Sequence, residues 1–190
     1  MRIRASFFFF ALLFSLFISH SFEALALFIA AVLHELGHVL AAYLCDIPLD
    51  ELRLGAFGAS ITPKYGLSSY KKEIFLALGG PLSNVVCAVL ILPFAKSGGF
   101  SELIFAASLF LSLVNLLPID DLDGGRVLKC ALLQKLSPSS VDRACSIISF
   151  FLVLTVWLIS VYLLLRRSLS LSLFTFSLSL FCKIFLRQKN

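Results

Sequence analysis

The sequence contains little charge for its length. Asp, Glu, Lys and Arg make up 14% of the 190 residues, whereas hydrophobic residues make up 59% and the mean hydropathy is +0.99. A typical soluble domain has about a quarter of its residues charged. The shortage excludes an ordinary soluble domain, and the many large apolar side chains exclude intrinsic disorder. The composition predicts a membrane protein.

Cysteine is present in a pattern that argues against disulfides and thiolate metal sites. The chain has five cysteines, an odd number, and none of them forms a C-x-x-C pair. We interpret them as small packing residues: Cys45, Cys87, Cys130, Cys145 and Cys182. The net charge of +5 does not come from one basic face either, because Lys and Arg are dispersed between hydrophobic runs. No nucleic-acid partner is therefore expected.

Long apolar runs predict the transmembrane segments. A helical span uses about 20 residues, and little period-two alternation over most of the chain argues against an outer-membrane barrel. The last run does alternate, but a lone strand would leave its backbone unpaired in lipid, so a helix is predicted there. The expected fold is an all-α membrane protein, a polytopic bundle of about six transmembrane helices forming a single domain over residues 1–190. The predicted spans lie near residues 5–19, 23–45, 73–95, 101–119, 143–165 and 168–186.

The distribution of basic residues predicts the orientation. The first run resembles a signal peptide, but no small-residue cleavage site follows it, so an uncleaved anchor is expected. If every run spans, thirteen of the sixteen Lys and Arg residues fall on one side. The positive-inside rule makes that side cytoplasmic and places both termini there. The three remaining basic residues, on the opposite side, are Lys96, Arg166 and Arg167.

Two connections have features of their own. Residues 54–62 are apolar and glycine-rich yet too short to span, which predicts a re-entrant β-like segment beside a cavity. An ordinary interfacial loop is the alternative. Residues 125–136 have the pattern of a short amphipathic helix, and the Ser and Pro residues at 137–140 end it.

The second predicted span contains the motif H-E-x-x-H at residues 34–38. Positions i and i+4 of a helix lie about 40° apart around the axis and roughly 6 Å apart along it. Both His34 and His38 can therefore reach one zinc ion, and Glu35 can take a proton from an attacking water whose pKa the ion lowers. A chance match or a pair of packed histidines is the alternative, but ionisable groups at bilayer depth usually mark a functional site.

A catalytic zinc site needs a third protein ligand. His20 lies at the far end of the first predicted span, so carboxylates are the candidates. Asp120, Asp121 and Asp123 follow Pro118, which ends the fourth span on the same side of the membrane as the histidines. Gly124 and Gly125 permit a tight turn that can direct an Asp back towards the second span. A solvated acidic loop is the alternative, and the residues alone leave open which carboxylate would bind.

These motifs together resemble the site-2 protease family of intramembrane zinc metalloproteases, most closely its sporulation branch, the stage IV sporulation protein FB type. The family combines an H-E-x-x-H helix with a later N-x-x-P-x-x-x-L-D-G segment. The resemblance covers about residues 23–136. It implies one zinc ion per chain held by His34, His38 and Asp123, with Glu35 as the catalytic acid/base.

The same resemblance implies a substrate-binding region. Residues 79–84 are similar to the family's G-P-x-x-N stretch, and Phe57 with Gly58 is similar to its membrane-embedded strand. Asn84 and Asn115 would then face the site and hydrogen-bond the substrate backbone.

The activity implied is that of an intramembrane zinc metalloendopeptidase, a multi-pass protein of the lipid bilayer whose active site opens to the cytoplasm. Its substrate would be a membrane-associated or single-span protein, such as a sporulation transcription-factor precursor. No PDZ or CBS domain is expected, so regulation would come from the membrane segments or from a separate membrane protein. This chain departs from the sporulation branch in one respect: where that branch tends to have a proline before Leu-Asp-Gly, this chain has Asp120 and Asp121. A metal-ion transporter and an inactive protease-like scaffold are the alternatives, and a transporter would not need Glu35.

Overall fold

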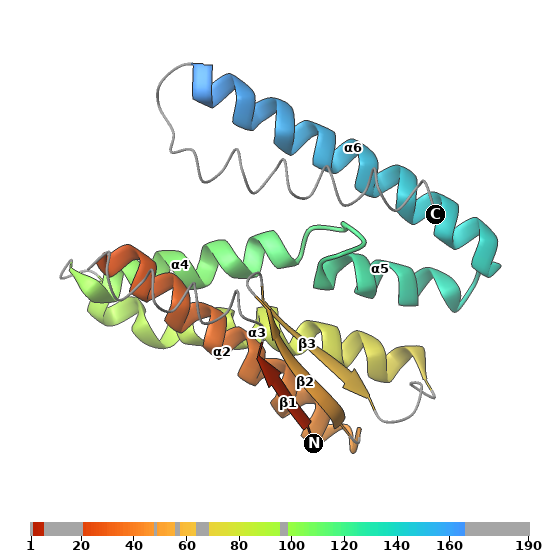
Figure 1. Ribbon diagram of the computed structural model, residues 1–190, viewed down its shortest axis with the longest axis horizontal. Coiled ribbons are helices and arrows are strands. Elements are labelled where there is room, and N and C mark those ends of the chain that lie inside the picture. Colours follow the sequence, from red (N-terminus) through yellow and green to blue (C-terminus); the bar gives the residue numbers. More distant parts are fainter. Residues whose placement is uncertain are drawn as a thin grey trace. The chain divides into compact units, whose positions relative to one another are not determined.

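The structure of the protein is a computed structural model (Figure 1). The residues that it describes are 2–5, 21–47, 49–55, 58–63, 69–95 and 99–165. They belong to two compact units, Met1–Leu117 and Pro118–Asn190, and each unit is described by itself. Residues 6–19 of the first predicted span and all of the last predicted span lie outside the described residues.

Helix α2, Phe22–Leu44, begins and ends at identifiable caps. The Ser21 hydroxyl accepts a hydrogen bond from the Ala24 N–H, which satisfies one of the free donors of the first turn. At the other end, the Lys72 ammonium donates to the Cys45 carbonyl at 2.8 Å. Since Lys72 belongs to the next helix, this bond ties the end of α2 to the start of α3.

Helices α2, α3 (Tyr70–Ala95) and α4 (Phe100–Asn115) pack against one another in the first unit (Figure 1). Small side chains make the approach close: Ala26 and Ala30 of α2 contact Ala107 of α4. These three helices lie where the sequence predicts the second, third and fourth spans.

The closest approach of α2 and α3 occurs where two glycines face each other. A Cβ atom added at Gly79 would lie 2.6 Å from the carbonyl oxygen of Gly37 and 2.6 Å from the Ala41 Cβ. Without side chains at Gly37 and Gly79 the two backbones can touch, as they do at small-residue contacts between membrane helices. This contact brings α3 against the helical face that carries His34 and His38.

The first unit also contains a three-stranded sheet in the order β1-β2-β3 (Figure 1). Its strands are β1 (Arg2–Ala5), β2 (Leu49–Gly55) and β3 (Gly58–Pro63). β1 pairs with β2 in parallel, and β2 pairs with β3 antiparallel as a hairpin. The predicted β-like segment at 54–62 thus falls on the end of β2 and on β3, while its re-entrant placement stays a prediction. Strand β1 and most of β2 are additions to the all-α fold that the sequence predicts.

The second unit contains α5 (Asp123–Leu133) and α6 (Pro138–Leu165). Lys129 and Asp142 form an ion pair of 2.7 Å between the two helices. The predicted amphipathic helix is therefore present as α5, but it begins two residues earlier than expected, so Gly124 and Gly125 lie in its first turn and not in a loop.

Three helices of the described chain are long and apolar enough to cross a membrane: Phe22–Leu44, Tyr70–Ala95 and Pro138–Leu163. α4 is also apolar, but its 16 residues are fewer than a perpendicular span needs. Large apolar side chains cover the outward faces, and Leu90 of α3 is 68% exposed. Such surfaces are stable in lipid and would be costly in water, which identifies an integral membrane protein.

Candidate metal centre

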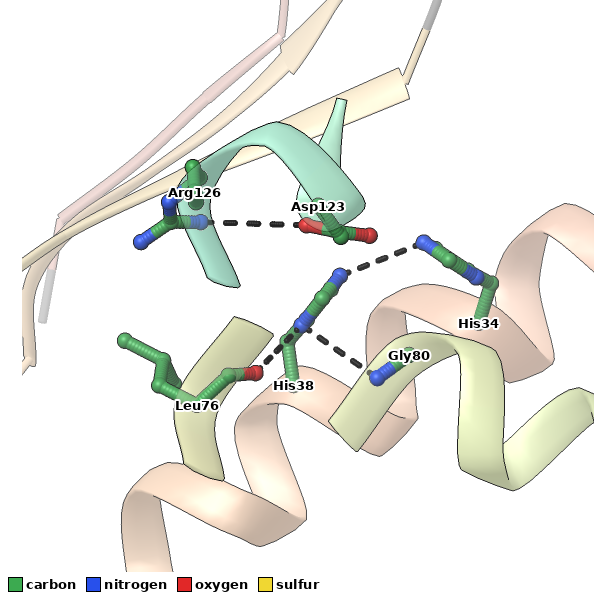
Figure 2. Close-up of polar contacts among 6 residues, drawn as sticks. All are labelled: His34, His38, Leu76, Gly80, Asp123 and Arg126. Carbon is green, nitrogen blue, oxygen red and sulfur yellow. Dashed lines mark hydrogen bonds and ion pairs between the residues drawn. The ribbon is translucent and has the colours of Figure 1, made fainter. Parts of the chain in front are cut away.

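His34 and His38 lie one turn apart on α2, and both are buried, with exposed fractions of 5% and 7%. Their Nε2 atoms are 3.2 Å apart (Figure 2). When two nitrogens bind the same tetrahedral zinc ion, each at about 2.05 Å from it, they lie roughly 3.3 Å apart. The spacing of the two imidazoles therefore suits a shared zinc ion.

The other ring nitrogen of His38 is held by α3. Its Nδ1 lies 2.8 Å from the carbonyl oxygen of Leu76 and 3.3 Å from the backbone nitrogen of Gly80 (Figure 2). A carbonyl can only accept, so the shorter contact requires the proton on Nδ1. The Nε2 atom of His38 then keeps its lone pair for a metal, which is the usual arrangement of a metal-ligating histidine.

Gly80 leaves space directly beside the two Nε2 atoms. A Cβ atom at this position would lie 2.6 Å from Nε2 of His34 and closer still to Nε2 of His38. Any other residue would therefore fill the volume towards which both lone pairs converge. The local structure fits a metal ion at this point.

Ser83 and Asn84 complete the wall that α3 presents to the histidines. The Ser83 hydroxyl lies 2.8 Å from the carbonyl oxygen of Leu33, the residue before His34. Asn84 is fully buried, and its Nδ2 lies 3.4 Å from Nδ1 of His34. Each imidazole thus has a polar group of α3 at its Nδ1.

Glu35 follows His34 on α2 and is half-buried. Its place in the sequence keeps a carboxylate within one residue of the first imidazole. Helix α2 thus brings the two imidazoles together on one face, and the catalytic role of Glu35 stays a prediction.

Asp123 is the first residue of α5 and is 8% exposed. One of its carboxylate oxygens lies 3.8 Å from Nη1 of Arg126, one turn later (Figure 2). The N-terminus of a helix stabilises a carboxylate through its free N–H groups. Asp121, by contrast, is exposed, and Asp120 is half-buried. Of the three candidate carboxylates, Asp123 is the one that the fold buries.

The loop before Asp123 is fixed by the second unit itself. The Asp120 N–H donates to the Ser149 hydroxyl of α6 at 2.9 Å. The Ile119 carbonyl passes so close to Gly125 that a Cβ atom there would collide with it. Gly125 therefore serves close packing of the loop on α5, and the structure assigns it no turn.

The remaining predicted residues lie in different places. Asn115 is the last residue of α4, and its side-chain Nδ2 donates to the Leu111 carbonyl of the same helix at 3.0 Å. Gly58 is the first residue of β3. Phe57 lies outside the described residues. Sequence reasoning missed Leu76, because a backbone carbonyl leaves no signal in the side-chain pattern.

Comparison with known proteins bears on both units. The sequence model described as peptidase family M50 matches residues 22–101 and 94–156. The chain is 29% identical over 114 residues to stage IV sporulation protein FB of Bacillus subtilis, which covers 57% of this chain and 40% of that protein. It is 29% identical over 120 residues to a zinc metalloprotease of Methanocaldococcus jannaschii, which covers 57% of this chain and 34% of that protein.

The fold also has a counterpart among solved structures. The site-2 protease from Methanocaldococcus jannaschii matches with a TM-score of 0.70 and 22% sequence identity, over 97% of this chain and 89% of that one. The chain spans less than half the length of the two curated relatives named above.

Proposed function

Because this chain belongs to peptidase family M50, we propose that it is an intramembrane zinc metalloendopeptidase. One observation carries the proposal: two buried imidazoles, His34 and His38, have their Nε2 atoms 3.2 Å apart beside the side-chain-free Gly80. A Cβ atom at position 80 would collide with both rings, so glycine lets the two imidazoles pack against α3 with their Nε2 atoms together.

We propose that one zinc ion per chain is held by His34, His38 and Asp123. The family match covers all three residues. Among the neighbouring carboxylates Asp123 is the buried one, and burial restricts a side chain to few orientations, as a metal ligand requires. The ion pair with Arg126 at 3.8 Å does not distinguish a metal ligand from a purely structural carboxylate.

Zinc, when bound, supplies a Lewis acid that polarises the scissile carbonyl and makes water acidic. The protein's own residues do the rest. Glu35 takes a proton from the attacking water and returns it to the leaving amine, as a general base and then a general acid. The Leu76 carbonyl fixes the tautomer and orientation of the His38 ring, so that Nε2 carries the lone pair that would bind the metal.

The proposed substrate is a membrane-associated or single-span protein. The helices that surround the site have apolar outer faces, so a substrate can approach through lipid. Asn115, Phe57 and Gly58 stay predicted substrate contacts, on the resemblance of their motifs. On the resemblance of its motifs to the sporulation branch, the first candidate substrate is a sporulation transcription-factor precursor. The 29% identity to stage IV sporulation protein FB supports only the comparison with that branch.

The orientation in the membrane and the regulation of the protease are also proposed. We propose that the active site opens towards the cytoplasm, with both termini on that side, because the basic residues are concentrated there. A separate membrane protein is the proposed regulator.

The test uses the purified full chain in detergent or liposomes with a single-span candidate precursor. We expect about one zinc per chain, cleavage of the precursor, loss of cleavage on chelation and its return with added zinc. Cleavage that persists after complete removal of metal would contradict the proposal. Zinc flux across liposomes without cleavage of any precursor would favour the transporter alternative.

A further inference from the structure

Asn84 is a buried polar side chain whose hydrogen-bonding groups are only partly satisfied. It lies on α3, one turn after Gly80, and its exposed fraction is zero. Its Nδ2 lies 3.4 Å from Nδ1 of His34. Within the part of the chain that the structure describes, its Oδ1 has no hydrogen-bond partner. A buried amide oxygen without a partner costs about 1–3 kcal/mol, so this side chain calls for an explanation.

The chemistry of His34 supplies one. If His34 binds zinc through Nε2, its remaining proton must sit on Nδ1, and that N–H needs an acceptor. His38 meets the same requirement with the Leu76 carbonyl, 2.8 Å from its Nδ1. The amide of Asn84 lies beside Nδ1 of His34. Its oxygen and nitrogen are so alike in shape that their hydrogen-bond partners decide which one faces the ring.

We propose that Asn84 is a positioning residue for the metal ligand His34: its Oδ1 accepts the Nδ1 proton and holds the ring with Nε2 towards the ion. Rotating the amide by half a turn places Oδ1 at the position 3.4 Å from Nδ1 of His34, where it can accept this proton, and moves Nδ2 to the other side of the amide. The inference rests on the proposed zinc site. It gives Asn84 a role different from the substrate contact that the sequence resemblance implies, and its complete burial favours the new role.

Helix α3 then orients both imidazoles of α2. Leu76, Gly80 and Asn84 follow at intervals of four residues and so lie on one face of the helix. The first supplies a carbonyl to His38, the second leaves space for the ion, and the third supplies an acceptor to His34. Such outer partners typically contribute 10–100-fold to metal affinity.

The experiment measures zinc affinity by competition with a chromophoric chelator, using the full chain in detergent. Asn84→Leu keeps the approximate size but removes the acceptor, and we expect its affinity to fall about 10–100-fold. Asn84→Asp supplies acceptor oxygens at the same position, so its affinity should stay within a few-fold of wild type. Ser112→Ala is the matched control, because Ser112 of α4 is also a buried polar side chain packed on α3, where its hydroxyl donates to the Pro81 carbonyl.

Cobalt substitution provides a second readout. The visible spectrum of bound Co²⁺ depends on the geometry of its ligands, so Asn84→Leu should alter it while Ser112→Ala should not. If Asn84→Leu binds zinc as tightly as wild type, the inference is wrong. If Asn84→Leu does not fold, the smaller Asn84→Ala takes its place, because it also lacks an acceptor. An affinity at least about 10-fold below that of Asn84→Asp supports the acceptor role, and equal affinities overturn it.

The two proposals fail differently. A wild-type chain that binds no zinc, or a His34→Ala variant that binds it normally, would refute the metal site itself. If the wild type binds zinc through His34 and every Asn84 variant binds it with the same affinity, only the positioning role is refuted.

Discussion

The carbonyl oxygen of Leu76 lies 2.8 Å from Nδ1 of His38, so the backbone of α3 orients a side chain carried by α2. The contact depends on the close approach of the two helices at Gly37 and Gly79. Membrane helices lack a hydrophobic force between them and associate through such packing and polar contacts. The helix interface that stabilises the fold thus also builds the candidate metal centre.

Removing either imidazole should remove the metal. We expect His34→Ala and His38→Ala to lose more zinc affinity than the roughly 10–100-fold that a change of an outer partner costs. Chelator competition measures the affinity, and elemental analysis of the purified variants should find little zinc. His20→Ala is the control, because the third histidine of the chain belongs to the first predicted span. Full zinc occupancy in either ligand variant would place the site elsewhere.

Gly80→Ala tests the space beside the histidines. Its Cβ atom would lie 2.6 Å from Nε2 of His34, inside the volume proposed for the ion. Zinc affinity should therefore fall at least about 10-fold, the lower end of the cost of disturbing a metal site, as measured by chelator competition. Val86→Ala serves as control, since Val86 lies on the same helix but is 56% exposed. Unchanged affinity in Gly80→Ala would show that the ion does not bind at this point.

The choice among three carboxylates predicts unequal effects. Asp123→Asn should lower bound zinc and stop cleavage, because a carboxamide is a poor zinc ligand. Asp121→Asn is the matched control, since Asp121 is exposed. Zinc analysis that finds Asp121→Asn depleted and Asp123→Asn fully loaded would reverse the assignment.

The charge distribution predicts the topology. In a background without the five native cysteines, a cysteine at Ser68→Cys should react with an impermeant reagent from the cytoplasmic side, and one at Gly98→Cys from the opposite side. The expectation follows from thirteen basic residues on one side against three on the other. Labelling of both positions from one side would contradict the six-span arrangement.

Much of this fold is readable from the sequence because a bilayer imposes simple rules. Apolar runs of about 20 residues must become helices, and α2 and α3 begin and end within three residues of their predicted positions. Helix α6 ends at the predicted residue but begins five residues earlier, at Pro138. The family resemblance is confirmed by the peptidase family M50 match. The count of six spans remains a prediction, because the first and last runs lie largely outside the described residues.

What the sequence did not reveal depends on backbone contacts between elements. The pairing of β1 with β2 joins residues about 49 positions apart, and no local pattern encodes such pairing. The roles of Leu76 and Gly80 escaped for a similar reason: one acts through its carbonyl and the other through the absence of a side chain. The boundary of α5 was misplaced because Gly124 and Gly125 resemble a turn, whereas the packing of Ile119 on Gly125 requires a small residue within the helix.

The central claim is that the membrane-embedded H-E-x-x-H helix cleaves peptide bonds with zinc, and the Glu35→Gln variant tests it most directly. Zinc content and cleavage of a single-span precursor are measured on the same preparation of wild type and variant. The carboxylate transfers a proton and is not a ligand, so the variant should keep about one zinc per chain while cleavage falls at least about 100-fold. Cleavage by Glu35→Gln at the wild-type rate would contradict the account.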